Sequence, residues 1–180
     1  MEMNITSKFK RGNMKPFTAK EITLIAILSA SLTAGKLVLS GIPNVHIVTF
    51  LLIVYTVSFG RRQAMYAMII FVMTEMLLYG FGTWIFVYFW VWPMYVFVTS
   101  LLKTRIQSEF GFAILAGIFG LTFGFFAAII EGLLLGFYYG LAYWIAGIPF
   151  DIVHGISNFL ITLFLFKPVI RTIDQIKERM

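Results

Sequence analysis

Long apolar runs, separated by short polar segments, constrain this chain more than any other feature of its sequence. Hydrophobic residues make up 60% of its 180 residues and charged residues only 12%, whereas soluble domains have roughly 45–50% and about 25%. Since so small a chain cannot bury that much apolar surface in its own core, we expect lipid to surround most of it. The 20 phenylalanines exclude a disordered chain, and the absence of cysteine excludes a disulfide scaffold and a thiolate metal site.

The sequence predicts an all-α integral membrane protein with six transmembrane helices. The expected spans are residues 21–39, 46–59, 63–79, 83–102, 111–139 and 149–166. The second span has only 14 residues, so either it ends early or the loop before it dips into the membrane. Glycine and proline favour an aromatic loop over residues 140–148. Residues 1–20 and 167–180 are expected as a cytoplasmic N-terminal segment and a basic tail around a membrane domain of residues 21–166.

The placement of the positive charges predicts the orientation. Thirteen of the 14 lysines and arginines lie in the two terminal segments and in residues 60–62 and 103–105. The alternate loops, residues 40–46, 80–84 and 140–148, contain none. Because lysine and arginine accumulate in cytoplasmic loops, both termini are expected in the cytoplasm. The same placement argues against a nucleic-acid-binding face.

Three charged residues are expected at membrane depth, where polar groups are costly and commonly functional. Lys36 lies one turn from the end of the first span and could reach the membrane surface or face a site. Glu75 and Glu131 could each tie helices together as a buried carboxyl group or serve a function. These alternatives remain open at the level of sequence.

The start of the sixth expected span combines three polar side chains on one helical face. Asp151, His154 and Asn158 follow the spacing i, i+3 and i+7. Asp151 could instead stabilise a helix N-terminus. His154 and Asn158 should face the interior of the bundle, because lipid offers them no hydrogen-bond partner.

Aromatic residues gather on the side opposite the cations, and Trp84, Tyr88 and Trp92 form a stripe at four-residue steps. This one-sided placement suggests a pocket that opens outward rather than a belt at both membrane surfaces. Flat rings with a few polar groups suit a small heterocyclic ligand. The candidate substrate-binding residues are Lys36, Asn44, His46, Tyr79, Trp84, Tyr88, Trp92, Tyr139, Trp144, Asp151, His154 and Asn158.

Two rows of small residues recur at four-residue steps and predict close helix contacts. The first row is Ala26, Ala30 and Ala34, which could meet a partner protein or a neighbouring helix of the same bundle. The second row favours packing within the bundle, as a groove for neighbouring helices. It comprises Ala116, Gly120, Gly124, Ala128, Gly132, Gly136 and Gly140.

Catalytic motifs are absent from the sequence. His46 and His154 are not in any metal-site spacing, no nucleophile motif occurs, and no phosphate-binding loop is present. We therefore expect neither an enzyme, a metal nor a cofactor. Uphill transport by such a chain would need an ion gradient or a partner that hydrolyses ATP.

Several motifs occur in a set order over nearly the whole chain after residue 20. Together with the alanine row of the first span, they are Ile42-Pro43-Asn44-Val45, Phe59-Gly60-Arg61-Arg62, Tyr79-Gly80-Phe81-Gly82 and Ile148-Pro149-Phe150-Asp151-x-x-His154-x-x-x-Asn158. In this respect the chain resembles the substrate-binding S components of energy-coupling-factor (ECF) vitamin transporters.

The resemblance implies a high-affinity binding subunit of an importer in a bacterial plasma membrane. Such a subunit would dock through Ala26, Ala30 and Ala34 onto a transmembrane coupling subunit that is driven by two ATPase subunits. Cobalamin is the first expected ligand, and thiamine-like, pyridoxine-like and pterin-like molecules remain open. A proton-coupled secondary transporter that uses Glu75 or Glu131, and a membrane scaffold, are the alternatives.

Overall fold

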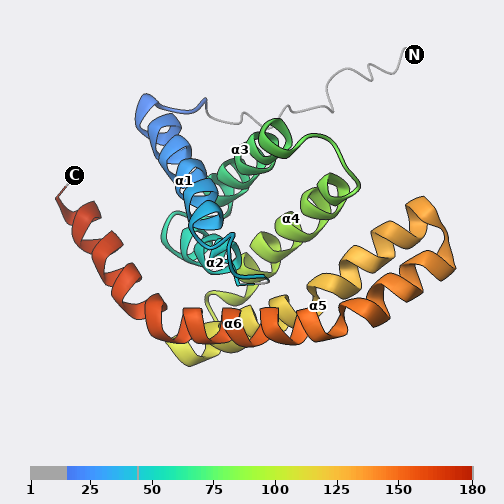
Figure 1. Ribbon diagram of the computed structural model, residues 1–180. Coiled ribbons are helices and arrows are strands. Elements are labelled where there is room, and N and C mark those ends of the chain that lie inside the picture. Colours follow the sequence, from blue (N-terminus) through green and yellow to red (C-terminus); the bar gives the residue numbers. More distant parts are fainter. Residues whose placement is uncertain (1–15, 44, 180) are drawn as a thin grey trace, which may run out of the picture.

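The computed structural model describes residues 16–43 and 45–179, which form six α-helices and no strand (Figure 1). The helices are α1 (Ala19–Val38), α2 (Val48–Ser58), α3 (Arg61–Tyr79), α4 (Trp84–Leu102), α5 (Glu109–Leu135) and α6 (Phe137–Glu178). The all-α class is confirmed. The first four helices begin and end within two residues of the expected spans, whereas α5 and α6 differ from expectation.

Polar caps explain where two of the helices begin. The Thr18 hydroxyl accepts a hydrogen bond from the Glu21 backbone N–H at 3.2 Å, and the Glu21 carboxylate accepts one from the Thr18 N–H at 2.9 Å. This reciprocal box satisfies two donors at the start of α1. Likewise, the Ser108 hydroxyl accepts from the Gly111 N–H at 3.2 Å at the start of α5. Both helices therefore start where a capping side chain precedes an apolar run.

Helix α2 is short and lies at the centre of the bundle. Its 11 residues extend about 17 Å, roughly half of a hydrocarbon core of about 30 Å. Eight of these residues are buried, and α2 contacts all five other helices. Protein rather than lipid therefore surrounds this helix, which satisfies the requirement for a short segment at membrane depth.

The remaining helices surround α2 in the order α1, α3, α4, α5 and α6. Each member of this series contacts the next, whereas α6 makes no contact with α1 in the part of the chain that the structure describes. The connection of residues 39–47 joins the end of α1 to the start of α2. Because α2 is much shorter than its neighbours, the space beyond Val48 is left to this connection and to the side chains around it.

Helices α5 and α6 form a tightly packed hairpin whose turn is Gly136. Gly136 has a φ of +104°, in the left-handed region that favours glycine. A Cβ atom added to Gly120 would lie 2.6 Å from the His154 carbonyl oxygen, and one added to Gly140 would lie 2.6 Å from the Ala128 carbonyl oxygen. The second row of small residues thus packs within the bundle, but Gly136 divides it and Gly140 belongs to α6.

The aromatic loop expected over residues 140–148 is wrong, as is the start of the sixth span at residue 149. Helix α6 is continuous over 42 residues and passes through Pro149 and Pro168. A helix satisfies its own backbone groups in lipid, whereas a loop would not, and each proline removes one N–H donor from the ladder. The basic tail of residues 167–180 continues this helix as far as Glu178.

The length of α6 also shapes the molecule. At 1.5 Å per residue it extends about 63 Å, which exceeds the hydrocarbon core twofold. Figure 1 shows α6 as a curved helix along one side of the molecule, with the α5–α6 hairpin extending past the other helices. The hairpin therefore exposes much of its apolar surface, including Leu133 and Phe137 at 78% and 73%.

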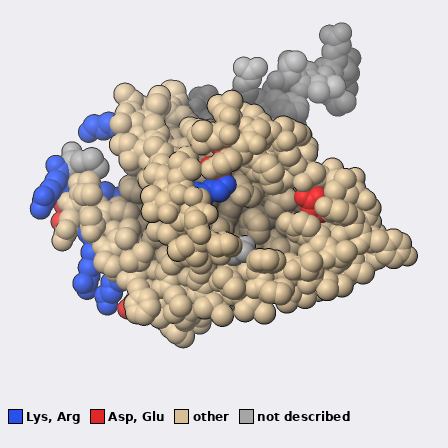
Figure 2. Space-filling view, viewed as in Figure 1, with Lys and Arg blue, Asp and Glu red and all other residues tan. Residues whose placement is uncertain are grey.

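Four helices, α1, α4, α5 and α6, are long and apolar enough to cross a membrane. This finding supports a membrane protein. Helix α2 is too short to cross unaided, and α3 carries Arg61, Arg62 and Glu75. Figure 2 shows most Lys and Arg side chains at one edge of the visible face, while one basic group lies beside an acidic group in a central hollow.

The close approach of α5 and α6 predicts that Gly120→Ala destabilises the protein. The added methyl group would overlap the α6 backbone, and overpacking of this kind typically costs about 1–3 kcal/mol. Gly147→Ala makes the same chemical change where no atom lies within 4 Å. Thermal unfolding in detergent should show a lower midpoint for Gly120→Ala only, and equal midpoints for the two variants would contradict the packing.

Candidate ligand-binding site

A pocket of about 420 Å³ lies where α1 ends and the short α2 begins. We call it the central pocket. The connection between α1 and α2 provides part of its wall. Five of the candidate residues also line it, namely Lys36, His46, Tyr79, Trp84 and Tyr88. The end of α1, the end of α3 and the first two turns of α4 thus bring together side chains that are far apart in the sequence.

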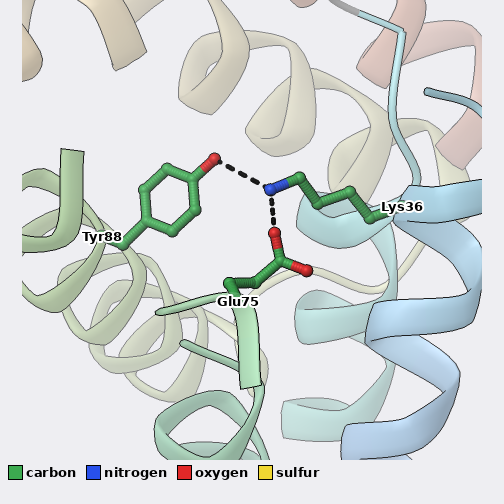
Figure 3. A network of polar contacts seen from close by, with 3 residues as sticks. All are labelled: Lys36, Glu75 and Tyr88. Carbon is green, nitrogen blue, oxygen red and sulfur yellow. Dashed lines mark hydrogen bonds and ion pairs between the residues drawn. The ribbon is translucent and has the colours of Figure 1, made fainter. Parts of the chain in front are cut away.

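A polar network crosses one side of the central pocket (Figure 3). The Lys36 ammonium group donates a hydrogen bond to the Glu75 carboxylate and, at 3.4 Å, to the Tyr88 hydroxyl. The Glu75 side chain is fully buried and that of Lys36 is 26% exposed. Lys36 therefore points toward α3 and α4 instead of extending to the membrane surface.

The ion pair determines the charge of the pocket. A buried carboxylate is costly unless a cation and hydrogen bonds compensate it, and Lys36 provides both for Glu75. The rings of Tyr79 and Tyr88, with centroids 5.2 Å from the Lys36 nitrogen, complete the surroundings of the ammonium group. The pair joins α1 to α3, the hydrogen bond from Lys36 to Tyr88 adds α4, and the opposite charges of Lys36 and Glu75 offset one another on this side of the pocket.

Aromatic rings on α4 form the next side of the site. Trp84 and Tyr88 have ring centroids 5.1 Å apart, and Tyr88 and Trp92 have centroids 5.6 Å apart, all in edge-to-face geometry. This continuous stripe follows the predicted four-residue steps. Trp92 is only 2% exposed, so it contributes to the interior and not to an aromatic belt at the membrane surface.

Two histidines lie together at the central pocket, where His46 is a lining residue and His154 lies beside it. The His46 and His154 rings have centroids 4.3 Å apart, and Phe123 on α5 lies 5.4 Å from both His154 and Trp92. His46 comes from the connection between α1 and α2, outside the helices. A neutral imidazole can donate a hydrogen bond from one ring nitrogen and accept one at the other.

Several buried polar atoms of this region lack a hydrogen-bond partner among the described residues. They are the ring nitrogens Nδ1 of His46, Nε1 of Trp92 and Nε2 of His154, both amide atoms of Asn158, and the second carboxylate oxygen, Oε1, of Glu75. Buried donors and acceptors without partners cost about 1–3 kcal/mol each, and native proteins contain few of them. We call His46, Trp92, His154 and Asn158 the polar floor; of these four, His46 lines the central pocket and the other three are buried without lining it. Their arrangement suits a ligand or water that supplies both donors and acceptors.

The other candidate residues lie elsewhere. The Asp151 carboxylate accepts a hydrogen bond from the Gly124 backbone N–H at 2.9 Å and so joins α6 to α5 well inside α6, not at a helix N-terminus. Tyr139 and Trp144 are 50% and 38% exposed on the hairpin. Trp144 lines a separate apolar groove with Phe125. Asn44 lies outside the described residues.

The structure also shows what Glu131 contacts and where the alanine row of α1 lies, two points that the sequence left open. The Thr83 hydroxyl donates to the Glu131 carboxylate at 2.6 Å, so Glu131 links the start of α4 to α5. Ala26, Ala30 and Ala34 are exposed, while Ile25, Leu28 and Leu32 of the same helix face the core. The alanine row therefore does not pack within the described bundle.

Sequence reasoning missed the role of Phe123 and did not pair Lys36 with Glu75. Phe123 is one aromatic residue in an apolar run and carries no distinguishing signal. The ion pair had a usable signal, since both residues lie about one turn from the same ends of their helices. Among the described residues, no group of three or more metal-ligating side chains comes together.

Comparisons with protein families, with curated proteins and with solved structures gave no match to this chain. The function of the central pocket is therefore argued from its own geometry.

The Lys36–Glu75 pair predicts a non-additive response to substitution. Lys36→Met would leave the buried Glu75 carboxylate unpaired, at a cost of about 3 kcal/mol, the low end for buried pairs because Lys36 is partly exposed. Adding Glu75→Leu should recover most of this loss, since no charge remains to be compensated. A double-mutant cycle of unfolding free energies in detergent measures the coupling, and additive losses would argue against the pair.

Proposed function

We propose that this chain is the substrate-binding subunit of an ECF-type importer and holds a small heterocyclic nutrient in the central pocket. The observation that carries the proposal is the polar floor, whose buried donors and acceptors lack partners at a pocket lined by aromatic rings. Partner subunits would hydrolyse ATP, because the sequence contains no phosphate-binding loop.

The pocket supports a compact ligand. Its volume of about 420 Å³ is near the lower end of the range of about 300–1,000 Å³ for drug-sized ligands. Rings of Trp84 and Tyr88 would contact a flat heterocycle, and the polar floor would bind its nitrogen atoms and hydroxyl or amide groups. These features favour a thiamine-like, pyridoxine-like or pterin-like molecule over cobalamin, the first expectation from the sequence.

The orientation is part of the proposal. We infer six membrane segments with α2 enclosed by protein, both termini in the cytoplasm and the central pocket facing outward in a bacterial plasma membrane. The concentration of Lys and Arg at one end supports this orientation, because these residues favour the cytoplasmic side (Figure 2). The pocket lies at the opposite ends of α1, α3 and α4 from those cations.

The exposed alanine row supports a docking surface for a coupling subunit. Small side chains allow the backbone of a partner helix to approach closely, which is a main source of helix association in lipid. Ala26, Ala30 and Ala34 present such a surface on α1. In contrast, Glu75 and Glu131, the groups that a proton-coupled transporter would need, are each bonded within the bundle.

Experiments on the purified protein distinguish an importer subunit from a proton-coupled transporter and from a membrane scaffold. Titration with thiamine, pyridoxine, pterin and cobalamin, followed by the fluorescence of the four tryptophans, should show tight binding of one compact heterocycle. Mass spectrometry of co-purifying small molecules extends the search beyond this panel. Uptake into liposomes should then require the coupling subunit and the ATPases. Proton-driven uptake by this chain alone would refute the proposal, and a stable partner complex without any ligand would favour a scaffold.

The polar floor and the aromatic stripe predict which variants lose affinity. His154→Ala and Trp84→Ala should each weaken binding of the identified ligand by about 1–3 kcal/mol, through a lost hydrogen bond and lost ring contact respectively. Trp144→Ala is a matched control because Trp144 lies on the hairpin, outside the central pocket. Calorimetric titration measures the three affinities, and a loss only at Trp144 would move the site to the hairpin.

The docking surface predicts a separation of binding from transport. Ala30→Trp should abolish uptake that depends on the coupling subunit, because the indole would keep the partner helix away, while ligand affinity stays unchanged. Ile118→Trp adds an indole to another exposed position, on α5, and should leave uptake intact. Normal uptake by Ala30→Trp would exclude this surface as the docking site.

A further inference from the structure

A second, basic pocket of about 270 Å³ lies at the other end of the bundle. It is bordered by the last turn of α2, by the connection between α4 and α5, and by α6 where the membrane domain meets the basic tail. Three cations line it, Lys103, Lys167 and Arg171. The basic pocket shares no lining residue with the central pocket, so the ligands of the two pockets are independent of each other.

The charges of the basic pocket are only partly compensated. Lys103 donates to the Thr56 carbonyl oxygen at 3.2 Å and forms no ion pair with a described residue. Lys167 lies 3.6 Å from the Glu109 carboxylate, and both side chains are substantially exposed, at 55% and 40%. Arg171 makes no hydrogen bond or ion pair with any residue that the structure describes. Three cations thus face a single carboxylate, Glu109, in the pocket.

The remaining wall of the basic pocket is apolar. Phe112 and Phe166 stack with ring centroids 4.4 Å apart, and Val57, Ile106 and Ile170 extend this wall. Cations above an apolar wall, at the ends of helices that suit a membrane, match the boundary between lipid headgroups and acyl chains. A soluble anion would use the cations but would leave the apolar wall without a partner.

We propose that the basic pocket binds an anionic phospholipid. Its phosphate would lie among Lys103, Lys167 and Arg171, and the start of an acyl chain would cover the wall at Phe112 and Phe166. A soluble phosphate ester carries the same charged group as the lipid headgroup. The two kinds of ligand differ because only the lipid has an acyl chain that can contribute to binding. Basic pockets between membrane helices commonly select anionic headgroups in this way.

Native mass spectrometry of the full chain in detergent tests the proposal. Phosphatidylglycerol and phosphatidylcholine with identical acyl chains are added separately, and the bound fraction is measured against lipid concentration. Phosphatidylglycerol should bind more tightly. Arg171→Gln should weaken its binding about fivefold, and Lys167→Gln with Arg171→Gln about 25-fold, because each cation near a lipid surface contributes on the order of 1 kcal/mol.

A matched control separates the pocket from general surface charge. Lys20→Gln with Arg179→Gln removes the same charge from exposed positions that do not line the pocket, so its lipid binding should equal that of the unaltered protein. Equal weakening by both double variants, or no preference for phosphatidylglycerol, would overturn the proposal; the second result would leave an acidic segment of a protein partner as the occupant. Glycerol phosphate that competes as well as the lipid would assign the pocket to a soluble anion.

Discussion

The brevity of α2 determines how the rest of the molecule is arranged. Eleven residues cannot cross a hydrocarbon core, and the other five helices cover this apolar helix, as a short segment at membrane depth would require. Beyond the Val48 end of α2, a loop and not a helix occupies the space between the neighbouring helices. Side chains from α1, α3 and α4 line the space that remains. The central pocket thus exists because α2 is too short, and the elements around the end of α2 supply the residues that line the pocket.

The buried polar side chains of this region differ in how the free-energy cost of their burial is offset. Lys36 and Glu75 compensate one another, so their charges are satisfied within the protein (Figure 3). Asn158 and His154, deeper in the bundle, keep donors and acceptors that no described residue satisfies. The first arrangement links α1 to α3, although the Oε1 atom of Glu75 has no hydrogen-bond partner among the described residues. The second arrangement costs free energy, because buried donors and acceptors remain without partners. A bound molecule that offers both donors and acceptors would form the missing hydrogen bonds.

Apolar length and four-residue periodicity were sufficient to predict the first four helices and the stripe of Trp84, Tyr88 and Trp92, because both features are local. The loop expected at residues 140–148 failed because glycine and proline end helices in water more readily than in lipid, where α6 runs through Pro149. That error also misplaced Tyr139 and Trp144, whose positions depend on the hairpin. Phe123 could not be predicted, since its role depends on which face of α5 meets His154.

Helix α1 connects the two surfaces on which the proposed function depends. Its alanine row is exposed on one side, while Lys36, half a turn beyond Ala34, reaches into the central pocket and bonds to α3 and α4 through Glu75 and Tyr88. A helix moves as a rigid unit over such a short distance, so a partner that shifts α1 also shifts the Lys36 ammonium group. Because α1 makes no helix contact with α4 in the described part of the chain, the hydrogen bond from Lys36 to Tyr88 directly links α1 to the aromatic wall. Ligand affinity and docking are therefore expected to influence each other through this one helix.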